Sequence, residues 1–125
     1  MSLRTPLGRV LGRGSAGDGV GHWWEQRVTA IALIPLSAWF AVSLVRRHAG
    51  KFEDMQAWLS QPWPALLALL LVVALAWHSK LGVQVVIEDY IHAKGAKTTL
   101  LVLSTFLHFA AAFTGIFAIL RLALA

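Results

Sequence analysis

The sequence predicts an all-helical membrane protein, with three transmembrane helices in an antiparallel bundle and the N-terminus inside. Of the 125 residues, 58% are hydrophobic and only 14% are charged, whereas charged residues make up about 25% of an average soluble protein. Three apolar stretches are long enough to cross about 30 Å of hydrocarbon as helices. We expect spans at about residues 24–46, 64–88 and 98–121, within a single domain of residues 1–125. No segment shows the alternation of a transmembrane β-strand.

The distribution of basic residues predicts the orientation of the chain. The net charge is +5, but the eleven Lys and Arg residues are scattered along the sequence without forming a basic stripe, which argues against a nucleic-acid partner. Cytoplasmic segments of membrane proteins carry an excess of these residues. The N-terminal side carries Arg4, Arg9, Arg13, Arg27, Lys94 and Lys97, and the opposite side carries Arg46, Arg47, Lys51 and Arg121. This excess favours an inside N-terminus.

The segments outside the spans have distinct compositions. Residues 1–21 are rich in glycine and arginine and contain no apolar stretch of signal-peptide length, so we expect a flexible inner arm. The same composition would also suit an organellar transit peptide. Pro35 removes one hydrogen bond inside the first span, so we expect a bend there. After this span, a short amphipathic segment predicts a small anchoring helix on the outer membrane surface, through Phe52, Met55, Trp58 and Leu59.

An imidazole near the middle of the second span is the feature most indicative of function. An ionisable side chain in hydrocarbon marks a functional site by default, and His78 makes haem iron the candidate metal. At 100° per residue, Gly82 and Asp89 share a helix face with His78. Gly82 would leave bare backbone against which a flat macrocycle could lie. Because the chain contains no cysteine, thiolate-bound iron-sulfur clusters are excluded. A three-helix unit this small has little interior, so we expect a partner chain to complete any cofactor site.

Polar residues also gather at the predicted inner surface, where the first span begins and the second ends. Arg27 could pair with haem propionates, because guanidinium groups suit carboxylates. Tyr90 could donate a hydrogen bond to a quinone carbonyl, while the adjacent Asp89 carboxylate holds the phenol in place or relays protons. A plainer alternative is an interface belt in which Tyr90 anchors the helix and Asp89 forms an ion pair with Arg27.

Two further polar residues lie within the spans. His108 lies close to the depth of His78, so both histidines could ligate one haem within a single chain. The bulky neighbours of His108 favour instead a structural histidine that is hydrogen-bonded to a nearby group. Lys80 is unfavourable at its depth unless it snorkels to the interface or meets a polar partner.

The run from His78 to His92, in which Asp89 and Tyr90 follow the histidine after eleven steps, resembles the signature of the hydrophobic membrane anchor of succinate dehydrogenase, the D-type subunit of respiratory complex II. Residues 27–31, Arg-Val-Thr-Ala-Ile, resemble the start of the first span in that family. The resemblance covers nearly the whole chain, although only these two segments are specific.

This resemblance implies a subunit that has neither flavin nor succinate site and is not itself catalytic for succinate oxidation. It would hold the flavoprotein and iron-sulfur subunits at the membrane, together with a C-type cytochrome b556 anchor, among the lipids of a bacterial inner membrane rather than a mitochondrial one. His78 would be one axial ligand of a haem b whose second ligand comes from that partner anchor, and Arg27 would lie by a propionate. Tyr90 would hydrogen-bond ubiquinone, supported by Asp89.

Two alternatives remain beside this electron-transfer function. The chain could be a non-redox membrane scaffold or assembly protein whose histidines are structural. It could also be a self-contained small cytochrome b that uses His78 and His108. Succinate oxidation and fumarate reduction are both compatible with the sequence.

Overall fold

Residues 16–46 and 51–124 are described in the computed structural model, and all the regular structure among them is helical. The elements are α2 (Ala16–Arg46), α3 (Phe52–Leu59), α4 (Pro62–Tyr90) and α5 (Lys94–Leu124). Three helices are long and apolar enough to cross a membrane: 27 residues of α2 from Val20 to Arg46, 29 in α4 and 31 in α5. The prediction of an all-helical protein with three transmembrane helices is therefore confirmed.

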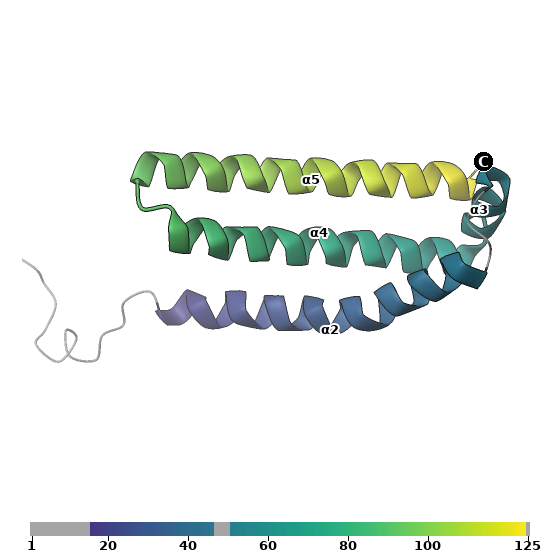
Figure 1. Cartoon of the computed structure of the whole chain (residues 1–125), viewed down its shortest axis with the longest axis horizontal. Helices are drawn as coiled ribbons and strands as arrows, with labels where there is room; N and C mark the ends of the chain where they lie inside the picture. The colour runs from purple at the N-terminus through teal and green to yellow at the C-terminus, as the bar shows by residue number, and fades with distance from the viewer. Residues whose placement is uncertain (1–15, 47–50, 125) are drawn as a thin grey trace, which may run out of the picture.

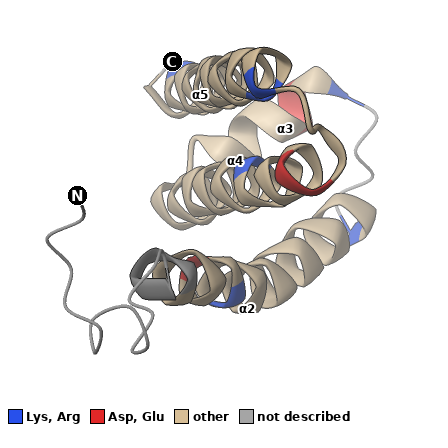
Figure 2. Ribbon diagram, turned by 90° about the vertical axis from the view of Figure 1, so that its left-hand side faces the viewer, with Lys and Arg blue, Asp and Glu red and all other residues tan. Residues whose placement is uncertain are grey.

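The long helices lie side by side in a row, and each runs opposite to the next (Figure 1). Among the described residues, the backbone of α4 lies close to those of both α2 and α5, whereas no Cα atom of α2 comes within 8 Å of one in α5. Figure 2, which looks along the helices, shows the same order, with α4 in the middle. The row is therefore more open than the predicted bundle, and α4 keeps two faces that no helix of this part of the chain covers.

The first long helix differs from its predicted extent at the N-terminal side. Helix α2 begins at Ala16, so residues 16–21 are helical and the predicted arm is shorter than residues 1–21. The rest of that arm lies outside the described residues. Pro35 lies inside α2 without ending it, and the helix bends in its C-terminal half (Figure 1). A bend is expected where proline removes one backbone hydrogen bond and its ring displaces the preceding turn.

The short helix α3 closes the end of the row where α2 ends and α4 begins (Figure 1). Trp58 and Leu59 are only 2% and 8% exposed. The Trp58 ring lies 5.5 Å from that of Trp39 and 6.0 Å from that of Phe40, centroid to centroid. The prediction of a surface anchor is thus wrong for Trp58 and Leu59, which pack inward, whereas Phe52 is exposed as a membrane-facing residue would be.

A tight connection holds the other end of the row, where α2 begins, α4 ends and α5 starts; we call this the predicted inner end. Only residues 91–93 separate α4 from α5, which forces the two helices to be antiparallel neighbours. Nζ of Lys97 donates a hydrogen bond of 2.8 Å to the backbone carbonyl of Glu88. A cation on a carbonyl of the last turn is favourable because that end of a helix carries partial negative charge.

Candidate functional site

His78 lies on the α4 face that packs against α2. Its Nδ1 atom is 3.0 Å from the hydroxyl oxygen of Thr29 on α2. Its other ring nitrogen, Nε2, makes no hydrogen bond within the described part of the chain. The buried polar side-chain atom that lacks a partner there is Nε2 of His22, not that of His78. The free nitrogen of His78 is therefore reachable from outside the chain.

A second hydrogen bond joins α2 and α4 beside the first. Nε1 of Trp77 donates to a carboxylate oxygen of Glu25 over 3.3 Å. Glu25 and Thr29 are four residues apart and so share one face of α2, and their partners Trp77 and His78 are adjacent on α4. We call these four residues the polar clasp. Its two hydrogen bonds join α2 and α4 at the level of His78.

Gly82 provides open space one turn from His78. A Cβ atom built on Gly82 would meet nothing within 4 Å, so the bare backbone faces a region that the described residues do not fill. Both residues are only partly buried. The predicted combination of an imidazole and a flat open patch on one helix face therefore exists in the structure.

The residues predicted for the quinone site lie at the predicted inner end. Asp89 and Tyr90 form the last turn of α4, and both are exposed, Tyr90 to 76%. The start of α2 lies at the same end (Figure 1), as expected for antiparallel helices. A phenol and a carboxylate are thus held at one helix terminus, free to contact another molecule.

Arg27 does not pair with Asp89. Its guanidinium carbon lies 5.4 Å from the centre of the Trp23 ring, one turn earlier on α2, and no carboxylate among the described residues pairs with it. Arg27 is two residues from Thr29, so at 100° per residue it lies on roughly the opposite side of α2 from the polar clasp. The alternative of an Arg27–Asp89 ion pair is therefore not found in this structure.

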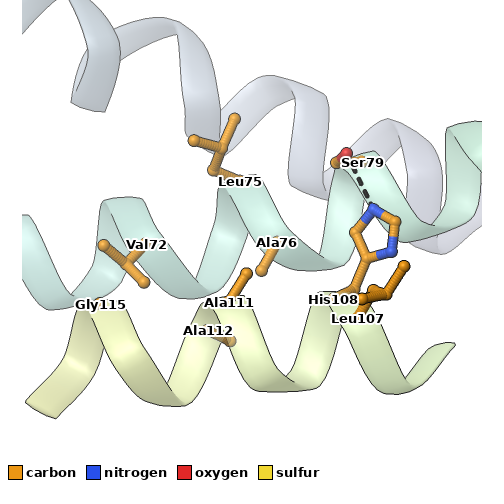
Figure 3. A pocket seen from close by; sticks show the side chains of 9 residues that line it. All are labelled: Val72, Leu75, Ala76, Ser79, Leu107, His108, Ala111, Ala112 and Gly115. Atoms are coloured by element: carbon orange, nitrogen blue, oxygen red, sulfur yellow. Dashed lines mark hydrogen bonds between the residues drawn. The ribbon is translucent and has the colours of Figure 1, made fainter. Parts of the chain in front are cut away.

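His108 is hydrogen-bonded through both ring nitrogens. Nε2 lies 3.1 Å from the hydroxyl of Ser79 on α4, and Nδ1 lies 2.7 Å from the backbone carbonyl oxygen of Ser104 on α5. Figure 3 shows the ring turned toward Ser79, at one end of a groove of about 430 Å³ between α4 and α5. The two intramembrane histidines thus contact different helices, since His78 bonds to α2. This arrangement supports the structural interpretation of His108.

Lys80 has no carboxylate partner in the described part of the chain. Its ammonium nitrogen is 5.3 Å from the centre of the Trp77 ring. A cation over an indole face is favourable by about 0.5–2 kcal/mol, which offsets part of the cost of its depth. Trp77 therefore contacts Glu25 through its N–H and Lys80 through its ring.

Side chains within residues 16–46 and 51–124 do not by themselves build a metal site. Among the described residues, no group of three or more His, Cys, Asp or Glu could hold an ion. A haem places different demands on a protein, because the porphyrin supplies four nitrogen ligands and only axial ligands are needed. Sequence reasoning had not singled out Glu25 or Thr29 as partners of α4. Their four-residue spacing inside an apolar span was the available signal.

The chain is similar in sequence to known membrane anchor subunits. The family described as "Succinate dehydrogenase/Fumarate reductase transmembrane subunit" matches residues 1–117. The succinate dehydrogenase hydrophobic membrane anchor subunit of Paracoccus denitrificans is 29% identical over 124 residues, covering 99% of this chain and 95% of that protein. The subunit of the same name from Rickettsia bellii is 36% identical over 103 residues, or 80% of each chain.

A third relative bears a similar subunit name. The succinate dehydrogenase membrane anchor subunit of Reclinomonas americana is 33% identical over 85 residues, covering 65% of this chain and 68% of that protein. No solved structure matches the chain. The family match and these relatives show that this multi-pass membrane protein belongs to the family of succinate dehydrogenase and fumarate reductase transmembrane subunits.

Proposed function

We propose that this chain is the hydrophobic membrane anchor subunit of a succinate:quinone oxidoreductase in a bacterial inner membrane. The relatives bear this subunit name, and the alignment with the Paracoccus protein is nearly full-length. In this role the chain holds the flavoprotein and iron-sulfur subunits at the membrane, together with a C-type cytochrome b556 anchor. The uncovered faces of α4 support a partner of that kind, because they leave room for transmembrane helices of another chain.

The observation that carries this proposal is the unpartnered, reachable Nε2 atom of His78 beside the open backbone of Gly82. These two residues fit a haem b, since an imidazole nitrogen is a common axial ligand and a macrocycle needs a flat surface. When bound, the haem supplies one-electron transfer. His78 would hold it from this chain, and the cytochrome b556 partner would supply the other ligand, because both ring nitrogens of His108 are already hydrogen-bonded.

Arg27 is proposed to pair with a haem propionate through a change of side-chain position. Its guanidinium is exposed and rests on Trp23, an interaction that a carboxylate can replace. Since Arg27 lies away from the polar clasp, this role requires the long side chain to reach around α2. Arg27→Lys, which keeps the charge but loses the planar two-pronged donor, is the variant that tests it.

Tyr90 and Asp89 are proposed to form part of the ubiquinone site. Ubiquinone takes up two electrons and two protons to become ubiquinol, and each carbonyl oxygen receives one proton. The Tyr90 phenol donates a hydrogen bond to one carbonyl and makes it easier to reduce, while the adjacent Asp89 carboxylate can pass protons from the inner surface. From His78 to Asp89 the helix rises about 16 Å, so the proposed haem would lie close to the proposed quinone site. Electrons would reach the quinone from the iron-sulfur subunit.

The proposal is tested by a reduced-minus-oxidised optical spectrum of the purified complex. His78→Ala is expected to abolish the b-type absorption band, whereas His108→Ala is expected to keep it. A complex without any b-type band before mutation would support the scaffold alternative. Haem binding by this chain expressed alone, lost in His108→Ala, would support a self-contained cytochrome b.

A further inference from the structure

Thr29 has more hydrogen-bonding neighbours than its single hydroxyl proton can serve. Its Oγ1 atom lies 2.9 Å from the backbone carbonyl oxygen of Glu25, 3.1 Å from that of Gln26 and 3.0 Å from Nδ1 of His78. Carbonyl oxygens can only accept, and a threonine hydroxyl inside a helix usually donates its proton to one of them. The oxygen lone pairs are then left for an N–H on Nδ1 of His78.

We infer that Thr29 is a positioning residue for the imidazole of His78: it accepts the Nδ1–H bond and so leaves Nε2 without a proton, free to bind iron. A neutral imidazole carries one proton, and placing it on Nδ1 fixes the tautomer. Histidine ligands of metals almost always donate their second N–H to such an acceptor. This inference rests on the proposed function, because it concerns the same haem ligand.

The surroundings of Thr29 hold this bond in place. Threonine is branched at Cβ, which restricts its side-chain rotation within a helix. The hydrogen bond between Trp77 and Glu25 joins the same two helices beside it but is exposed, whereas the Thr29–His78 contact is not. The Thr29–His78 contact is partly buried between two helices, where the low dielectric strengthens a hydrogen bond and little water competes for it.

The test uses the intact purified complex with Thr29→Val, which keeps the side-chain shape and removes the acceptor, and Thr29→Ser, which keeps the hydroxyl. Haem retention is expected to weaken about tenfold in the valine variant, the usual scale for losing such a partner of a metal ligand. The haem midpoint potential is expected to rise, because a less basic imidazole stabilises ferric iron less. A tenfold change in the ferric-to-ferrous affinity ratio corresponds to about 59 mV. Thr29→Ser should restore both properties.

Two further variants separate this role from helix packing. Trp77→Phe removes the other hydrogen bond of the polar clasp and should leave the midpoint potential unchanged. Thr29→Ala, which lacks the hydroxyl and adds no bulk, should shift the potential in the same direction as Thr29→Val. An unshifted potential in Thr29→Val and Thr29→Ala, or an equal shift in Trp77→Phe, would overturn the inference.

His78→Ala distinguishes this outcome from a failure of the proposed function. If His78→Ala abolishes the b-type band while Thr29→Val and Thr29→Ala match the unaltered complex, only the inference about Thr29 is wrong. If His78→Ala retains the band and its potential, His78 is not the ligand, and the proposed haem role and the inference fail together.

Discussion

Tyr90 offers a single-atom test of the proposed quinone site, because its exposed phenol ends α4 at the predicted inner end. Tyr90→Phe removes only the hydroxyl. We expect quinone reductase activity to fall between about twofold and tenfold, the value of one net hydrogen bond, while succinate oxidation with a soluble artificial acceptor stays unchanged. Steady-state assays with both acceptors measure this. Equal activity with quinone in both proteins would remove Tyr90 from the site.

His108 is expected to contribute to stability and not to redox chemistry. His108→Ala removes the bond to Ser79 across α4 and α5, and interhelical hydrogen bonds in membrane proteins average about 0.6 kcal/mol. We expect a small decrease in the thermal unfolding midpoint of the complex with an unchanged b-type spectrum. Loss of the b-type band with an unchanged thermal unfolding midpoint would instead make His108 a haem ligand.

Individual site residues differed in how far the sequence could predict them. His78 and Gly82 were predictable because helical periodicity alone places them on one face, and the structure leaves that face open at Gly82. Thr29 was not, since a threonine in a span bonds to its own backbone wherever it lies, and only packing shows which helix it faces. The same limit applies to Arg27, whose contact with Trp23 depends on a rotamer that the sequence does not determine.

At the scale of helices, Gly115 is predicted to set the distance between α4 and α5. A Cβ atom on Gly115 would lie 2.9 Å from Cγ1 of Val72, whereas a Cβ atom on Gly95 would meet nothing within 4 Å (Figure 3). Gly115→Ala should therefore lower the free energy of unfolding by about 1–3 kcal/mol through overpacking, although alanine favours a helix. Gly95→Ala is the matched control and should be neutral or slightly stabilising.

Denaturation followed by circular dichroism in detergent measures both glycine variants. Adding Val72→Ala to Gly115→Ala should restore stability, because it removes the atoms that the new methyl group would meet. If Gly115→Ala is as stable as Gly95→Ala, close packing at this point does not hold the two helices together.

The inward packing of α3 gives a second prediction for an element. Trp58 is 2% exposed and stacks near Trp39 and Phe40, whereas Phe52 on the same helix is 69% exposed. Trp58→Ala is expected to lower the free energy of unfolding by about 3–5 kcal/mol, and Phe52→Ala by much less. Equal effects of the two substitutions in the same denaturation assay would mean that α3 only rests on the membrane.

The sequence located α3 but not its role, for a physical reason. Residues at helical spacing define an apolar stripe, and both a lipid surface and a protein core can cover such a stripe. The aromatic residues of α2 that receive Trp58 lie about twenty residues earlier in the chain, beyond the reach of any local pattern. The spans themselves were predictable because hydrocarbon thickness sets their length directly.

At the scale of the whole molecule, the open row of helices explains why a partner is proposed. Periodicity predicted three antiparallel helices, but it could not show that α2 and α5 lie on different sides of α4, because apolar residues cover every face of a lipid-exposed helix. The free ring nitrogen of His78, the open patch at Gly82 and the exposed end of α4 all lie where another chain can reach them. A closed bundle would have left no such access.

The central claim is that His78 binds iron through Nε2 in a haem shared with a neighbouring subunit. A density map of the intact complex in lipid, at a resolution that separates side chains, tests it most directly. We predict a porphyrin against Gly82, with iron bonded to Nε2 of His78 and Nδ1 facing Thr29. A map in which His78 faces lipid tails, with no porphyrin between this chain and its partner, would contradict the account.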